Sequence, residues 1–556
     1  MAWTDKKKIA GLVPAILIPA VFFFFTFLIT DHAYILNDDL QLKSLLDGSF
    51  SGKPEYKTIY LRVPLAFLLS LLYRFLPGIQ FYDILLEGTY LICLLFICFY
   101  FSKRNDPSGL NLRSFVIPCI CAAAFFAFFL KDMLFLHYTL VAAAAGGTGI
   151  FLLSLSEERD ERIPAYILLI LCDQIREQVF LMFLPFVSVI AGMKLLVFIR
   201  AEDKKRVKDF LKEAAIALFV FVVLFLADRA AMKEGSYREY IDYNNARTEL
   251  YDYTGIWPEE EALSLYESLG VDEDLLAVMS AYDISFDERI DGRLMHKMAS
   301  YVPQKERKST GQKIKDTLWV LRKETFSPDD NGVYVLVLII AWLMMLITAV
   351  KEKDIISGVK LAAFICLHFL LYGYLIYRGR YPERVVVSLY LSGIAVAFSH
   401  KRPDLRQFIV PVILMALTLP GSIKTDLKSL EDANRAPLVL YSYVTRHPEE
   451  IFVTDTYADV DAVIYPCPDN MLHGGGWTSG SPAFKDRLKR FYVNDMEELL
   501  NGTASVRFVL KEGVGLKKEE LDHYLGKRFK KEDYETVLIE DIEENGCVYH
   551  IYAPGE

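Results

Sequence analysis

The stretch "VYVLVLIIAWLMMLITAV", residues Val333–Val350, contains 18 residues and no charged side chain. A helix needs about 20 mostly apolar residues to cross the hydrocarbon of a bilayer, and neighbouring protein tolerates somewhat shorter helices. The stretch therefore predicts a transmembrane helix, and similar runs recur along the chain. Ten further runs share this character: Ile9–Ile29, Ile79–Phe101, Phe115–Leu130, Met133–Leu155, Ile163–Ile175, Val179–Ile199, Ala214–Ala227, Ile355–Tyr377, Val385–Phe398 and Phe408–Leu419.

One more apolar run, Ile59–Leu76, is interrupted by Arg62, Pro64 and Arg74. Two charges and a proline fit a helix that lies at the membrane interface better than a helix that crosses the bilayer. The sequence therefore predicts an α-helical polytopic membrane protein with about 11 transmembrane helices.

The distribution of Lys and Arg supports this choice of spans. With the N-terminus in the cytoplasm, the cytoplasmic stretches hold 19 basic residues and the three short outer loops hold five. Basic residues concentrate on the cytoplasmic side of membrane proteins, and counting Ile59–Leu76 as a span would invert every later loop. We therefore expect a multi-pass protein of the cell membrane, with a cytoplasmic N-terminus and an extracytoplasmic C-terminal region.

Most of the remaining sequence forms two acidic regions. The chain has 556 residues, 53% of them hydrophobic and 24% charged, and a net charge of −10. Residues 228–332 carry 22 acids and 14 bases, and residues 421–556 carry 25 acids and 16 bases. The long apolar runs exclude an average soluble enzyme, and acidic soluble regions argue against binding to nucleic acid. We expect the lipid bilayer as a partner and no nucleic acid.

The two acidic regions differ in pattern. Residues 228–332 mix aromatic and charged residues at helical spacing, which predicts an outer helical insertion. Residues 421–556 combine the strand-like "EEIFVTDT" and "VRFVL" with the helix-like "KDRLKRF" and "MEELLNG", and Glu-Asn-Gly joins two apolar stretches as a hairpin turn. We therefore expect a transmembrane bundle over 1–420, with a first outer loop at 30–78, and a small extracytoplasmic α/β domain over 421–556.

Two of the eight cysteines, Cys467 and Cys547, lie in this outer domain, and the other six fall in spans. Cysteines in an oxidising compartment tend to pair. We therefore predict a disulfide between Cys467 and Cys547.

The first outer loop carries the strongest candidates for chemistry, the adjacent carboxylates Asp38 and Asp39. They follow the first span, so we expect them at the outer mouth of the bundle. A carboxylate there can act as general base on a hydroxyl that reacts with a lipid-linked substrate. The alternative is a solvated acidic cap at the start of a helix. Two adjacent Asp residues could also bind Mg or Mn, and the sequence leaves the cofactor open.

Charged residues at other outer helix ends are candidates for binding substrate. Arg176 and Glu177 form either a structural pair or a site that grips phosphate or sugar. The segment "YLIYRGRYPERVVV" places Arg378, Arg380 and Arg384 at one outer boundary. Guanidinium groups match phosphate oxygens in charge and geometry, so the three predict contact with a lipid-carrier phosphate. Contact with anionic headgroups or with the acidic outer regions is the alternative.

His137, in "FLHYTLVAAAAGG", stands near an outer helix end beside a run of small residues. Small residues allow helices to pack closely. We retain His137 as a candidate substrate-binding residue, although a packing role is the simpler alternative.

The order of these features resembles the GT-C superfamily, the integral membrane glycosyltransferases that use polyprenyl-phosphate-linked sugars. The resemblance is carried by Asn37, Asp38 and Asp39, and by Arg62 in "YLRVPLAFLLSLLY", where Leu61 replaces a Gly that related bacterial families often show. The segments "HGGGWTSGSP" and "YNNARTELYDY" also look like stretches of bacterial relatives, without an assigned role.

The resemblance implies an enzyme that moves a sugar from a polyprenyl-phosphate donor to a glycan, lipid or protein acceptor on the outer face, with inversion. Asp38 or Asp39 would deprotonate the acceptor, and arginines would stabilise the leaving phosphate. Some members of the superfamily require a divalent cation and others do not. The expected substrate-binding residues share a position at outer helix ends: Arg62, His137, Arg176, Glu177, Arg378, Arg380 and Arg384.

Two other functions stay open. A transporter or flippase of lipid-linked saccharide predicts an internal repeat and charges deep in several spans, and the sequence shows neither. A catalytically inactive scaffold for envelope glycopolymer would share the architecture of the enzyme, so only activity separates the two.

Overall fold

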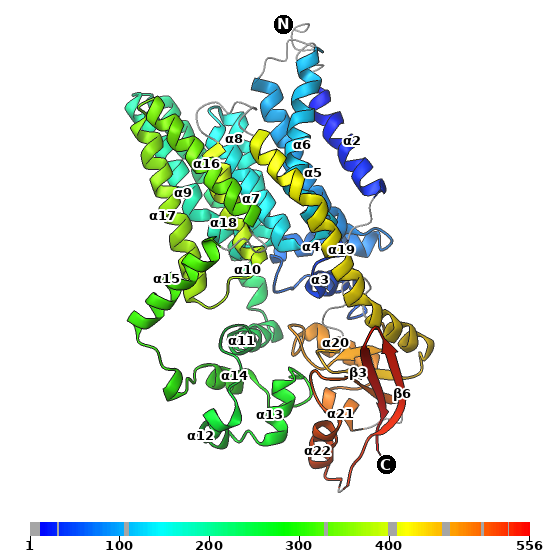
Figure 1. The fold of residues 1–556 in the computed structure, drawn as a ribbon. Coiled ribbons are helices and arrows are strands. Elements are labelled where there is room, and N and C mark those ends of the chain that lie inside the picture. The colour runs from blue at the N-terminus through cyan, green and yellow to red at the C-terminus, as the bar shows by residue number, and fades with distance from the viewer. Residues whose placement is uncertain are drawn as a thin grey trace.

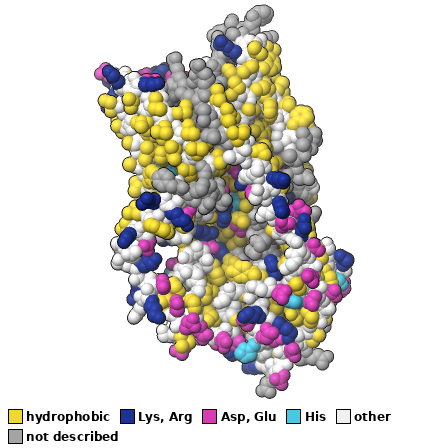
Figure 2. Space-filling view, viewed as in Figure 1, with side chains coloured by type: hydrophobic (Ala, Val, Ile, Leu, Met, Phe, Trp, Pro, Cys, Tyr) yellow, Lys and Arg dark blue, Asp and Glu magenta, His cyan; other side chains and the backbone are white. Residues whose placement is uncertain are grey.

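The computed structural model describes residues 12–29, 33–104, 110–326, 332–398, 409–458, 468–501, 505–531 and 533–555. Helices form one half of the molecule, and the other half combines short helices with a sheet (Figure 1). In the view of Figure 2 the helical half is largely covered by hydrophobic side chains, whereas charged side chains dominate the other half. The predicted disulfide involves Cys467, which lies outside the described residues.

Seven helices within the described part of the chain are long and apolar enough to cross a membrane. They are α5 (Phe81–Arg104), α6 (Leu112–Leu134), α7 (Tyr138–Leu155), α9 (Glu177–Arg200), α10 (Lys204–Met232), α16 (Gly332–Lys351) and α17 (Ile355–Tyr377). The chain is therefore an α-helical membrane protein. The other predicted spans coincide with α2 (Pro14–Ile29), α8 (Arg159–Ile175), α18 (Glu383–Phe398) and the first part of α19 (Ile409–Arg446), and the count of 11 stays a prediction.

Helix α7 occupies the centre of the bundle. Its apolar window is 94% buried, against 11% for α10. Small residues allow this close packing, as the sequence predicts: a Cβ atom on Gly146 would lie 2.3 Å from the Phe183 ring of α9, and one on Gly149 would lie 3.0 Å from Leu169 of α8. Helix α7 is thus packed closely against α8 and α9.

The segment between α2 and α5 folds back onto the N-terminal end of α7. Strand β1 (Ala33–Tyr34) pairs in parallel with β2 (Phe135–Leu136), which directly precedes α7. Helix α3 (Asn37–Asp47) follows β1, and the short apolar helix α4 (Val63–Phe75) lies at the end of the bundle nearer the sheet-containing half (Figure 1). The pairing brings the start of α3 beside the start of α7.

The insertion is helical, as its residue spacing predicts. Its elements are α11 (Ser236–Thr248), the π-helix η1 (Glu249–Thr254), α12 (Glu259–Leu269), α13 (Glu273–Ser280), α14 (Gly292–Ala299), the 3-10 helix η2 (Gln304–Glu306) and α15 (Thr310–Phe326).

The C-terminal region contains a five-stranded mixed sheet of order β4-β3-β5-β7-β6. The strands are β3 (Ile451–Thr454), β4 (Met471–His473), β5 (Val506–Lys511), β6 (Val537–Glu544) and β7 (Cys547–Ala553), accompanied by α20 (Pro482–Arg490), α21 (Met496–Leu500) and α22 (Lys518–Phe529). The predicted hairpin is confirmed: Asn545 and Gly546 join β6 to β7 with φ of 51° and 76°, which suits a type I′ turn.

The insertion and the C-terminal region share one hydrophobic core. Leu275 and Val278 of α13 belong to the same buried cluster as Leu521 and Tyr524 of α22. Helix α19 runs without interruption from the bundle into the outer half, so the predicted boundary at residue 421 falls inside a helix. The half that contains the sheet therefore packs as one body built from two distant segments of the sequence; we refer to it below as the outer half, after its predicted orientation.

Candidate functional site

The adjacent carboxylates Asp38 and Asp39 occupy the first turn of α3 and lie in different surroundings. Asp39 is fully buried. Its Oδ1 accepts a 2.6 Å hydrogen bond from the Tyr82 hydroxyl and a 3.1 Å bond from the backbone N–H of Tyr138. Burial raises the pKa of Asp39 well above its ordinary range. A solvated cap is therefore wrong for Asp39, which joins α3, α5 and α7.

His137 caps α7 behind this carboxylate. Its Nδ1 accepts a 3.0 Å hydrogen bond from the backbone N–H of Thr139 and lies 3.8 Å from Asp39 Oδ2. Burial, together with the charges of Arg384 and Arg176, lowers the pKa of His137 well below its ordinary value. The ring is therefore neutral, with its proton on Nε2, and a fully buried neutral cap fits the packing role.

Asp38 is half-buried and faces cationic side chains. Burial raises the pKa of Asp38, while Arg384, Arg176 and Arg247 act in the opposite direction, as does the indole N–H of Trp477. Within the described part of the chain, no Lys or Arg nitrogen lies within 4.0 Å of this carboxylate. The charges of the three guanidinium groups therefore act on Asp38 from a distance, without a direct ion pair.

Aromatic rings pack against Arg176 and against one another beside the acidic pair. The guanidinium carbon of Arg176 lies 4.7 Å from the ring centroid of Tyr60 and 5.2 Å from that of Tyr138. Tyr60 stacks on Tyr138 at 5.3 Å and meets Trp477 edge-on at 4.9 Å. Cation–π contact fixes Arg176 at the turn between α8 and α9 without occupying its N–H donors.

Arg247 joins the insertion to this site. It is 5% exposed, and its guanidinium donates to Asn244 Oδ1 at 2.9 Å, to Thr248 Oγ1 at 3.0 Å and to the Tyr282 hydroxyl. Tyr240, about two turns earlier in α11, donates a 2.7 Å hydrogen bond to the backbone carbonyl of Trp477. The site thus contains side chains from the bundle, the insertion and the C-terminal region.

Arg62 and Glu177 belong to a second cluster. The Arg62 guanidinium donates to Asp228 at 2.9 Å and to Asp173 at 3.1 Å, and lies 3.2 Å from Glu177. Burial disfavours its charge, but these carboxylates outweigh burial and raise the pKa of Arg62. Glu177 also pairs with Arg229 at 3.1 Å. The cluster ties α4, α8, α9 and α10 together, and each of its carboxylates already has a guanidinium partner.

The three arginines that follow α17 interact with two different parts of the structure. Arg378 and Arg380 lie against the ring of Tyr253 in the insertion, and Arg380 forms an ion pair with Asp252. Only Arg384, in the first turn of α18, acts on Asp38. The neighbour of the acidic pair is therefore Arg384, while Arg378 and Arg380 contact the insertion.

The acidic pair does not suit a divalent cation. Both oxygens of Asp39 are buried, and Oδ1 already accepts two hydrogen bonds. The described residues contain no group of three His, Cys, Asp or Glu placed to hold a metal. Three guanidinium charges around Asp38 favour an anion instead.

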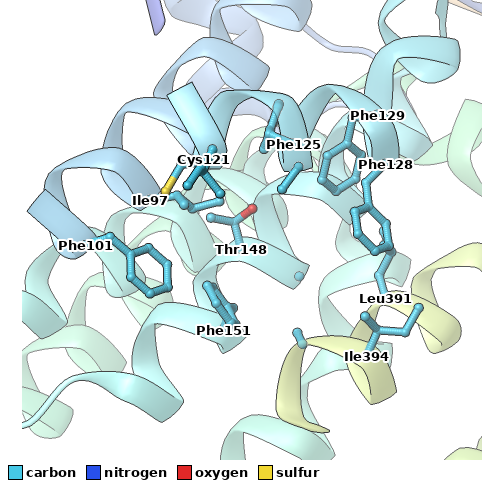
Figure 3. A pocket seen from close by; sticks show the side chains of 14 residues that line it. Ile97, Phe101, Cys121, Phe125, Phe128, Phe129, Thr148, Phe151, Leu391 and Ile394 are labelled. Carbon is cyan, nitrogen blue, oxygen red and sulfur yellow. The ribbon is translucent and has the colours of Figure 1, made fainter. Parts of the chain in front are cut away.

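An apolar groove opens below this site, between α6 and α18 (Figure 3). Phe125, Phe128 and Phe129 of α6 face Leu391 and Ile394 of α18 across it. Arg384 and Leu391 are seven residues apart on α18, so they share a face and are separated by about 10 Å along the axis. The cationic site thus lies above one end of a groove lined by hydrocarbon and aromatic side chains.

No protein-family model matches the chain, and neither a curated protein nor a solved structure matches it. The site must therefore be interpreted from its own geometry. The sequence predicts Asp38, Asp39, His137, Arg176 and Arg384 as candidates, and the structure brings them together.

Sequence reasoning missed Tyr60, Tyr82, Tyr138, Arg247 and Trp477. The only signal was that Arg247 and Trp477 fall in "YNNARTELYDY" and "HGGGWTSGSP".

Proposed function

We propose that the chain is a membrane glycosyltransferase that moves a sugar from a polyprenyl-phosphate donor to an acceptor at the site around Asp38. The observation that carries this proposal is a half-buried carboxylate that has no direct ion pair and is under the electrostatic influence of Arg384, Arg176 and Arg247, which belong to three separate elements. A base next to a cationic pocket is the combination that displacement of a phosphate leaving group requires.

The reaction balances with these groups. The acceptor hydroxyl gives its proton to Asp38 while its oxygen attacks the anomeric carbon. The bond from that carbon to the phosphate oxygen breaks, and polyprenyl phosphate departs with the electron pair, so the anomeric configuration inverts. Arg384 and Arg176 stabilise the charge that develops on the phosphate. The raised pKa of Asp38 brings the base nearer to neutral pH, where proton acceptance is most effective.

The apolar groove supports a lipid-linked donor. A phosphate held at Arg384 would leave its isoprenoid chain about two helical turns from Leu391, where the groove begins. Isoprenoid units match the lining of Phe125, Phe128 and Phe129 and would be buried from water there. Asp39 and the Arg62 cluster act as positioning residues because they hold α3, α7 and the outer helix ends.

The experiment uses the full chain in nanodiscs, with polyprenyl-phosphate-linked glucose, mannose, galactose and N-acetylglucosamine as donors and a membrane extract as acceptor. Release of polyprenyl phosphate is expected with one donor and should fall at least ~100-fold in Asp38→Asn. Decaprenyl phosphate binding, followed by native mass spectrometry, should survive in Asp38→Asn and weaken in Arg384→Ala. Arg238→Ala, an exposed arginine on α11, is the control. Release at the wild-type rate from Asp38→Asn would refute the proposal.

A further inference from the structure

A second, polar cleft lies in the outer half of the molecule, away from the lipid groove. Its volume is about 1090 Å³. It is lined by α11 and α14 of the insertion and by α20 of the C-terminal region. Pockets for small ligands measure roughly 300–1,000 Å³, so this cleft is large enough for a chain of several sugar units.

Two glycines of the cleft lining pack closely against Tyr243. A Cβ atom on Gly480 would lie 3.1 Å from the ring of Tyr243, and one on Gly292 would lie 3.2 Å from its Cα. Gly480 has φ of +71°, a conformation that side chains rarely adopt. The chain therefore passes close to Tyr243 from both sides and leaves an aromatic ring in the lining.

Several polar side chains face the cleft without holding one another. Glu239, Asp242 and Asn245 of α11, Arg293 of α14 and Lys485 of α20 all line it. Within the described residues, none of these five side chains makes a hydrogen bond or an ion pair. Such groups are free to donate to and accept from the hydroxyls of a ligand.

The charged residues that line the cleft indicate which class of ligand it can bind. Three cations (Arg293, Lys485, Lys489) and His296 line the cleft beside five carboxylates (Glu239, Asp242, Glu249, Asp291, Asp486). A polyanion or a phosphate would meet the carboxylates, and a polycation would meet the lysines and the arginine. A neutral polyhydroxylated chain matches mixed donors and acceptors beside an aromatic ring.

The cleft lies one layer of residues from the site at Asp38. Tyr240 lines the cleft, and its hydroxyl donates to the carbonyl of Trp477. The Trp477 ring contacts Tyr60 at 4.9 Å, and Tyr60 stacks on Tyr138, whose backbone N–H bonds to Asp39 beside Asp38. We infer that this cleft binds a neutral oligosaccharide, the acceptor chain whose end reaches Asp38. The acceptor role rests on the proposed function, whereas binding does not.

The test measures binding and transfer separately. Saturation-transfer NMR on the full chain in nanodiscs would use mannotetraose, galactotetraose, chitotetraose and maltotetraose as probes. We expect at least one to bind, and Asn245→Ala with Arg293→Ala to weaken its binding about tenfold or more. Arg238→Ala, on α11 but outside the cleft, should bind as wild type. Asp38→Asn should retain binding while transfer is lost.

Different outcomes separate the two proposals. If none of the four probes binds, or if the double variant binds them as wild type, the cleft assignment is wrong and the transferase proposal is untouched. If Asp38→Asn transfers sugar normally while the double variant loses binding, the cleft is confirmed as a glycan site and the transferase chemistry is refuted.

Discussion

Asp38 and Asp39 are adjacent in the sequence, yet Asp39 bonds to Tyr82 and to the start of α7 while Asp38 faces three arginines. Adjacent residues of a helix point about 100° apart around its axis. One carboxylate therefore points into the protein, and the other points toward the boundary between the bundle and the outer half. Asp38 is thus available to an incoming substrate, whereas Asp39 stabilises the position of α3 through its hydrogen bonds. The hollow between the two halves in Figure 2 contains basic side chains at this boundary.

The first prediction separates these roles. Asp38→Asn should abolish sugar transfer, because Asn cannot accept a proton at neutral pH. Asp39→Asn should reduce it less, since the Asn oxygen can still accept from Tyr82 and Tyr138. The measurement is kcat against pH for both variants, with circular dichroism to show folding. Equal loss in both variants would mean that Asp39 takes part in proton transfer.

The second prediction concerns the cluster at Arg62. Arg62→Ala leaves Asp173, Glu177 and Asp228 close together without their shared cation, and removal of one partner of a buried ion pair costs about 3–5 kcal/mol. Unfolding of the purified protein, followed by circular dichroism against denaturant, should show this loss. Arg435→Ala, which breaks an exposed pair with Glu431, is the matched control and should change stability little. A similar stability for both variants would contradict the structural role of Arg62.

Periodicity and composition predict the helices because apolar runs of sufficient length have few alternatives in a bilayer. They also predict that an acidic pair and an arginine at an outer helix end belong to one site. They could not predict that Arg384 rather than Arg380 approaches Asp38, because that choice depends on how Asp252 and Tyr253 of a distant insertion engage Arg380.

The glycines of "HGGGWTSGSP" show why no role could be predicted for this segment from the sequence. A Cβ atom on Gly474 would lie 2.3 Å from Asp283 Oδ1, and one on Gly475 would lie 1.8 Å from the carbonyl oxygen of Tyr282. The need for glycine arises from a contact with the insertion nearly 200 residues earlier. The same segment places Trp477 beside Tyr60. The role of these residues therefore depends on tertiary contacts that the sequence alone does not reveal.

The third prediction concerns topology. Reporter fusions after Arg104 and Arg206 should give cytoplasmic signals, and a fusion after Glu556 an extracytoplasmic signal, because Lys and Arg concentrate on the side opposite the acidic regions. The insertion and the C-terminal region share one core, so they must lie on the same side. A cytoplasmic signal at Glu556 would overturn the orientation and would place the Asp38 site on the wrong face for an outer acceptor.

The last prediction concerns pH and the contact between the insertion and the C-terminal region. Asp283 is fully buried, and its Oδ1 accepts 2.8 Å hydrogen bonds from the backbone N–H and the hydroxyl of Thr456. Asp455, whose oxygens accept from the backbone N–H groups of Tyr457 and Leu516, lies close to it. Burial and the charge of Asp455 raise the pKa of Asp283 well above 3.8.

A carboxyl with a raised pKa holds its proton more tightly in the folded state. Its contribution to stability is therefore complete below the ordinary Asp value of 3.8, and it declines as pH rises from there through the raised pKa of the folded state. The decline amounts to at most about 1.4 kcal/mol per pH unit for one proton. Asp283→Asn removes this titration and keeps an acceptor for Thr456, so it should flatten the dependence and stabilise the protein at neutral pH.

Asp287 provides a control of opposite sign in the same loop. Burial would raise its pKa, but Arg289, which donates to it at 2.7 Å, outweighs burial and lowers the pKa of Asp287. Its contribution is present above the ordinary Asp value and is lost as pH falls through the lowered value, so Asp287→Asn should destabilise the protein at neutral pH. Thermal unfolding of both variants between about pH 2 and 8 measures the two effects. The same pH profile for Asp283→Asn and wild type would show that Asp283 is not the buried proton-binding group.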